Sequence, residues 1–95
     1  MTTITILTQS SCAFCEQAKG TLSRLALEYP LQFREISLET VEGLELAAQY
    51  GVIFAPGILV DGEMFSYGRL PEKRLRRLLS QHLLPGVRMN DRVES

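Results

Sequence analysis

The chain has 95 residues, of which 45% are hydrophobic, and this size allows one compact domain but not two domains with separate cores. Its 11 acidic and 10 basic side chains give a formal net charge of −1, so no overall field attracts nucleic acid or an anionic membrane. The sequence shows no basic leader and no apolar run near the roughly 18 residues that cross a bilayer. We therefore expect a soluble, cytoplasmic monomer with no nucleic-acid or membrane partner.

The first third of the chain predicts a strand, a helix and a second strand. Residues 3–7 (TITIL) combine β-branched side chains with period-two spacing. From Ser11, small and apolar side chains recur every three or four positions, as on one buried helix face, until Pro30 stops the run. Residues 31–38 (LQFREISL) indicate the second strand, although its apolar alternation slips in the middle, where we expect a bulge or an early end.

The middle of the chain predicts a second helix. Thr40 is a favourable cap for residues 41–50 (VEGLELAAQY), and Gly51 is suited to end that helix in a left-handed conformation. Gly43 weakens this helix, because glycine has a low helix propensity. The caps at both ends nevertheless favour a helix here.

The last third predicts a hairpin and a final helix. Asp61-Gly62 separates two apolar strand candidates, GILV and EMFSY, and this dipeptide favours a tight turn. Pro71 suits the first turn of a helix whose leucines face inward and whose basic side chains, Lys73 among them, face solvent. Residues 85–95 lack periodicity and are predicted to form a flexible tail.

These elements give the order β-α-β-α-β-β-α over one domain, residues 1–84. Two strands joined through a helix are expected to be parallel with a right-handed crossover, whereas the strands of the hairpin are antiparallel. The predicted fold class is therefore α/β, with a four-stranded mixed sheet and helices on both of its faces.

The chemistry of the chain centres on its two cysteines, Cys12 and Cys15, in SSCAFC, where the first strand leads into the first helix. A reducing cytosol does not maintain such a pair as a structural disulfide, and a CxxC in a β-α-β unit favours a redox motif. A closed zinc site needs four ligands, and the chain adds one histidine, His82, on a distant helix. No metal site is expected within one chain, although two chains, with or without glutathione, supply enough ligands for a zinc or iron–sulfur centre.

A redox role assigns different tasks to the two thiols. If Ser10 or Ser11 caps the helix, Cys12 lies at its amino end, where unpaired N–H groups and the helix dipole stabilise a thiolate. Cys12 is then the nucleophile. Cys15 lies one turn further along the buried face, where it is protected until it resolves the mixed disulfide.

A second motif makes a comparison with a known family specific. Residues 47–63 (AAQYGVIFAPGILVDGE) place Pro56 directly before a strand. Together with the CxxC pair they resemble the thioredoxin-fold superfamily, in particular its glutaredoxin and small glutaredoxin-like branch. The resemblance covers residues 3–84 and implies a thioredoxin fold. It also implies that Pro56 is cis and that the main chain of Ala55 pairs with the substrate as an added strand.

The resemblance further implies a small dithiol–disulfide oxidoreductase that needs no organic cofactor. Its partner is then a disulfide-containing protein or glutathione, and glutathione would serve as a co-substrate. A reductase supplies the electrons. The alternative that stays open is an iron–sulfur or metal-binding module completed by glutathione or by a second chain.

The chain departs from both branches at several positions. Ala13 and Phe14 stand between the cysteines, where thioredoxins carry Gly-Pro and glutaredoxins Pro-Tyr, and Ile6 replaces the buried aspartate of thioredoxins. Phe14 is interpreted either as an exposed aromatic that docks partners or as local packing. Gly68 and Arg69 stand where glutaredoxins hold glutathione. We consider them as a backbone N–H donor and a carboxylate partner, or else as a turn glycine and a solvated charge.

Overall fold

A computed structural model describes residues 1–83, except for the side chains of His82 and Leu83. Within this range the predicted order of elements is confirmed. The predicted domain end at Leu84 and the predicted tail, residues 85–95, lie outside the described residues. The elements are β1 (Thr2–Thr8), α1 (Ala13–Leu25), β2 (Leu31–Ser37), α2 (Val41–Tyr50), β3 (Gly57–Val60), β4 (Glu63–Tyr67) and α3 (Glu72–Leu83).

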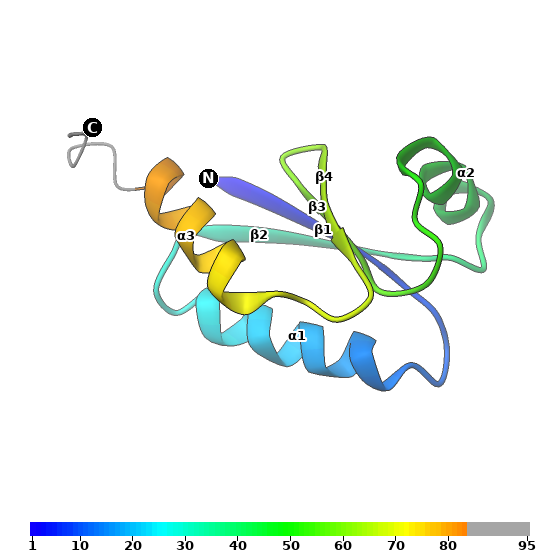
Figure 1. Cartoon of the computed structure of the whole chain (residues 1–95), viewed down its shortest axis with the longest axis horizontal. Helices are drawn as coiled ribbons and strands as arrows, with labels where there is room; N and C mark the ends of the chain where they lie inside the picture. The colour runs from blue at the N-terminus through cyan, green and yellow to red at the C-terminus, as the bar shows by residue number, and fades with distance from the viewer. Residues whose placement is uncertain (84–95) are drawn as a thin grey trace.

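The strands form one mixed sheet in the order β2-β1-β3-β4. β1 pairs in parallel with β2 on one side and antiparallel with β3 on the other, and β3 and β4 form the predicted antiparallel hairpin. Figure 1 shows α1 and α3 on one side of the sheet and α2 beyond the other. The α/β fold class with helices on both faces is therefore confirmed. None of the helices within residues 1–83 has the length and apolar content needed to cross a membrane.

The main core lies between the sheet and the helices α1 and α3. Alternate side chains of a strand point to opposite faces, so β1 and β3 each direct every second side chain into this core. Both helices present the predicted apolar stripe to the same face, and burying each aliphatic side chain is worth about 1.5–3 kcal/mol. The buried cluster consists of Ile4, Ile6, Ala18, Leu22, Leu25, Ile58, Val60, Leu75 and Leu79.

The first helix is shorter than the sequence predicts. The N-cap is Cys12 rather than Ser10 or Ser11, because Cys12 has the extended backbone of a cap residue and its sulfur accepts the Cys15 N–H. Ser11, with a φ of 54°, belongs to the loop before the cap. At its other end α1 stops at Leu25. Turns bonded back to the last helical carbonyls fill the segment before Pro30.

The second strand is more regular than its sequence suggests. Each residue from Leu31 to Ser37 pairs in register with one residue of β1, so the expected bulge is absent from β2, and the strand ends one residue early. The irregularity of the sheet lies instead between Ile58 and Leu59, in the pairing of β3 with β4. β2 is an edge strand with mostly exposed side chains, so burial does not enforce apolar alternation along it.

The caps of α2 and the turn of the hairpin follow the prediction. The Thr40 hydroxyl accepts a hydrogen bond from the Gly43 N–H at 3.0 Å, and Gly51 ends the helix with a φ of 72°. Asp61 and Gly62 have φ values of 50° and 83°, as a tight hairpin turn requires. α3 begins at Glu72, directly after the proline that the sequence singles out.

Candidate active site

The two cysteines are joined by a disulfide bond at the amino end of α1, with their Cα atoms 5.2 Å apart. Cys12 has an extended backbone, and its sulfur accepts a hydrogen bond from the Cys15 N–H at 3.0 Å. The Cys12 carbonyl accepts from the Glu16 N–H at 3.2 Å. A sulfur in this position faces the first N–H groups of the helix and the positive end of its dipole, which favour a thiolate over a thiol.

The two cysteines differ in their access to solvent. Cys15 is 1% exposed and lies on the buried face of α1 with Ala18, whereas Cys12 is only half-buried. Phe14, between them, is 43% exposed, so much of its ring lies at the surface. The start of the helix thus separates an accessible sulfur from a protected one, in agreement with the burial that the sequence predicts.

The loop that carries Cys12 is held by the connection between β2 and α2. Glu39 in this connection accepts a hydrogen bond from the Ser10 hydroxyl and another from the Ser10 N–H at 3.3 Å. Both bonds lower the pKa of the Glu39 carboxyl from its ordinary value of 4.5, and the bond from the hydroxyl has the larger effect. Sequence reasoning missed this contact, which forms because two parallel neighbouring strands end at the same edge of the sheet.

The lowered pKa of Glu39 predicts a pH-dependent contribution to stability. Because the pKa is lower in the folded chain than in the unfolded chain, the charge stabilises the fold above pH 4.5 and loses this effect as the pH falls through the lowered pKa. We expect Glu39→Gln to unfold at a lower denaturant concentration at pH 7, and the difference to shrink at acidic pH. The control is Glu45→Gln, at an exposed position of α2. A difference that stays constant through the acidic range contradicts this role of the charge.

The segment before β3 lies next to the cysteine loop. The Ala55–Pro56 peptide bond is cis, as the resemblance implies, and both residues are buried. Gly57 pairs with Leu7, so Pro56 lies level with the end of β1, from which the chain continues to Cys12. Figure 1 shows the start of α1 and the segment that joins α2 to β3 at the same end of the molecule.

Two aromatic rings cover the turn that follows β4. Phe54 and Tyr67 pack edge to face, with ring centroids 5.2 Å apart and an interplanar angle of 88°. Gly68 has a φ of +77° and lies under Phe54, so a Cβ there would come within 2.7 Å of a ring carbon. The Gly68 N–H donates to the Pro56 carbonyl at 2.8 Å. The amide that the sequence suggests as a donor to the substrate is therefore already bonded within the fold. Arg69 follows it and is exposed.

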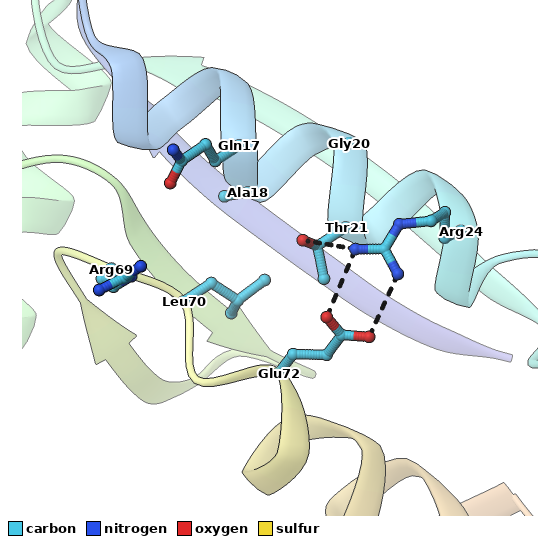
Figure 2. Close-up of a pocket in the computed structure, with 8 residues that line it drawn as sticks. All are labelled: Gln17, Ala18, Gly20, Thr21, Arg24, Arg69, Leu70 and Glu72. Carbon is cyan, nitrogen blue, oxygen red and sulfur yellow. Dashed lines mark hydrogen bonds and ion pairs between the residues drawn. The ribbon is translucent and has the colours of Figure 1, made fainter.

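A groove of about 510 Å³ runs beside α1, between this helix and the segment that leads from β4 into α3 (Figure 2). Sequence reasoning singled out Arg69 but missed the groove. The available signal was a row of polar side chains at positions i, i+4 and i+7 of α1, next to the buried stripe. The groove is lined by Gln17, Ala18, Gly20, Thr21, Arg24, Arg69, Leu70 and Glu72.

The described part of the chain contains no set of side chains arranged to bind a metal ion. No three histidine, cysteine or acidic side chains within residues 1–83 are grouped so that they could hold a metal ion. The side chain of His82 is outside the described residues. The alternative hypothesis of a metal or cluster site therefore still depends on ligands from glutathione or a second chain.

Comparison with known proteins agrees with this geometry. A family model described as "Thioredoxin domain" matches residues 2–80. A curated relative from Archaeoglobus fulgidus, named "Probable Thioredoxin", is 25% identical over 79 residues, which cover 83% of this chain and 87% of that protein. Among solved structures, a mutant thioredoxin from Halobacterium salinarum matches with a TM-score of 0.67 at 22% identity, over 86% of this chain and 74% of that one. Thioredoxin from Fasciola hepatica matches with a TM-score of 0.62 at 24% identity, over 85% and 80%.

The fold and the disulfide-bonded CxxC pair at the start of its first helix define a thioredoxin-fold protein with a redox-active pair. The family model spans most of the chain, and the chain belongs to the thioredoxin domain family. This membership and the linked cysteines support thiol–disulfide exchange as the class of chemistry.

Proposed function

We propose that the chain is a thiol–disulfide oxidoreductase that reduces disulfides of partner proteins through Cys12 and Cys15. The observation that carries this proposal is the position of Cys12. It caps α1, its sulfur accepts the Cys15 N–H at 3.0 Å, and it is more accessible than Cys15. A dithiol of this form needs no organic cofactor, since the two sulfurs themselves carry the electrons.

The proposed reaction proceeds through a mixed disulfide. The Cys12 thiolate attacks one sulfur of the substrate disulfide, and the other substrate sulfur leaves as a thiolate. Cys15 then loses its proton and attacks the Cys12 sulfur. The Cys12–Cys15 disulfide forms, and the first substrate sulfur also leaves as a thiolate. The dithiol has passed two electrons to the substrate, and both substrate thiolates take up protons from water.

The proposed substrate contacts surround the cysteines. The pairing of β3 with β1 begins at Gly57, so Ala55 lies beyond the paired part of the strand, where its main chain suits an added strand from the substrate. Pro56 is buried between Ala55 and Gly57, and its ring restricts the backbone there, which aligns the Ala55 main chain for this pairing. The exposed ring of Phe14 offers an apolar contact next to the reacting sulfur.

We further propose a partner protein, rather than glutathione, as the preferred substrate. Gly68 stands where glutaredoxins contact glutathione. Its N–H is bonded to the Pro56 carbonyl, and the ring of Phe54 covers it. The exposed rings of Phe14 and Phe54 also give apolar surface that a protein segment can cover. A reductase that acts on protein disulfides then returns the pair to the dithiol.

The pH dependence of alkylation tests the proposed nucleophile. We expect the alkylation rate of Cys12 in the reduced chain to rise with a midpoint well below the value of about 8.5 for a free thiol, because the start of α1 stabilises the thiolate. Mass spectrometry distinguishes Cys12 from the buried Cys15, which we expect to react more slowly. The control is the same thiol in concentrated denaturant, where the helix is absent. An equal midpoint in the folded and the unfolded chain contradicts the proposal.

A further inference from the structure

The groove beside α1 carries one cation with no partner in the described chain. Arg24 is engaged, because it donates to Glu72 at 3.3 and 3.4 Å and to Thr21 at 3.2 Å. Hydrogen bonds from Arg24 and then from Arg76 lower the pKa of Glu72, which keeps this pair ionised. Arg69 is exposed and forms no hydrogen bond or ion pair within residues 1–83. The groove is therefore neutralised at one end and positive at the other.

The positive end of the groove combines groups that suit a peptide. Figure 2 shows the Gln17 amide and the Arg69 guanidinium on opposite walls at this end, with Leu70 pointing into the space between the walls. A guanidinium binds a carboxylate through two parallel N–H groups. A side-chain amide both donates and accepts, so it matches a backbone peptide group, while the partly exposed Leu70 offers contact to apolar atoms.

Along α1, this end of the groove begins within about a turn and a half of the cysteine pair. Gln17 is five residues after Cys12, which corresponds to about 7 Å along the helix axis. On the opposite wall, Arg69 directly follows Gly68, whose N–H bonds to the Pro56 carbonyl. An extended chain advances about 3.3 Å per residue, so a segment attached at Cys12 reaches the groove about two to four residues from its own cysteine.

We propose that this groove binds an acidic side chain of the substrate protein, about two to four residues from the cysteine that Cys12 attacks. Arg69 holds the carboxylate and Gln17 an adjacent peptide group. The inference rests on the proposed function and adds a substrate class to it: protein disulfides flanked by aspartate or glutamate. The chain itself has a net charge of −1, so such a preference cannot come from its overall charge.

Two disulfide peptides test the proposal through kcat/KM. They are identical except that one carries glutamates, and the other glutamines, at the second to fourth positions on both sides of the reactive cysteine. We expect the glutamate peptide to be favoured about threefold to fivefold, mainly through KM, and the preference to weaken at high salt. Arg69→Ala removes the preference, and Arg69→Lys keeps part of it. Arg77→Ala, which deletes an exposed charge of α3 outside the groove, leaves it unchanged.

A binding measurement separates this proposal from the proposed function. Cysteine-free versions of both peptides are titrated into the oxidised chain, and amide shifts are followed by NMR. We expect the glutamate peptide to shift Gln17 and Leu70 at lower concentration than the glutamine peptide, and Arg69→Ala to abolish this difference. Binding of this kind without reduction of either disulfide peptide overturns the proposed function alone. Equal kcat/KM values for the two peptides, or an equal loss of preference in Arg77→Ala, overturn the groove assignment.

Discussion

Cys12→Ser is expected to lower the rate of disulfide reduction by about a thousandfold or more, because serine at this position cannot attack sulfur at neutral pH. Cys15→Ser is expected to have a different result. The attacking thiolate remains, but nothing resolves the intermediate, so a mixed disulfide with the substrate accumulates. The measurements are reduction of a protein disulfide, with electrons from thioredoxin reductase or from glutathione with its reductase, and intact mass after incubation with substrate. The two donors also distinguish the two branches of the superfamily.

Serine is the appropriate replacement because its oxygen can still cap α1. Serine is a preferred N-cap residue, whereas alanine at an N-cap costs about 0.5–2 kcal/mol. Circular dichroism of Cys12→Ser is therefore expected to match that of the reduced parent, which assigns the lost rate to chemistry. Retained turnover in Cys12→Ser, or a stable adduct in Cys12→Ser but not in Cys15→Ser, reverses the assignment of the two roles.

Gly43→Ala is expected to destabilise the fold by about 1–3 kcal/mol, the usual cost of forcing extra atoms into a packed site. Replacing a helical glycine with alanine normally stabilises a helix by up to about 1 kcal/mol. At Gly43 the sign reverses, because a Cβ would overlap the Ser37 carbonyl oxygen and lie 2.9 Å from the Leu38 Cα, both in the backbone. Denaturant unfolding measures the change.

Gly20→Ala is the matched control for this prediction. Gly20 lies inside α1, and a Cβ there meets no atom within 4 Å, so alanine gains helix propensity without a clash. We expect this variant to be more stable than the parent by about 0.5–1 kcal/mol. If both glycine variants change stability in the same direction, the close approach of α2 to the end of β2 is wrong.

The order of elements was predictable because each element carries its own local signal. Thr40 caps a helix through its own hydroxyl, and Asp61-Gly62 turns the chain through its own backbone preferences. The sequence also predicts the buried stripes of α1 and α3, since their spacing depends only on helix geometry. The sequence was misread where contacts with a distant segment determine the role of a residue. Ser10 looks like a helix cap, but its hydroxyl and N–H bind Glu39 instead.

The site was predictable to the same extent. Cys12 and Cys15 are recognisable from their spacing, and the cis peptide bond before Pro56 from the resemblance. The surroundings of Arg69 depend on how α1 packs beside the chain that enters α3, and no local pattern records that packing. Gly43 shows the same limit, because a residue that weakens a helix in isolation permits the close packing of α2 in the fold.

The sulfur that begins α1 has a further consequence for electron transfer. In the oxidised chain it already accepts the Cys15 N–H at 3.0 Å, and a thiolate is an even better acceptor for the same donor. The helix terminus therefore solvates both oxidation states from one fixed position, as a preorganised dipole rather than as water that must reorient. Switching between dithiol and disulfide then demands little rearrangement of the surrounding backbone.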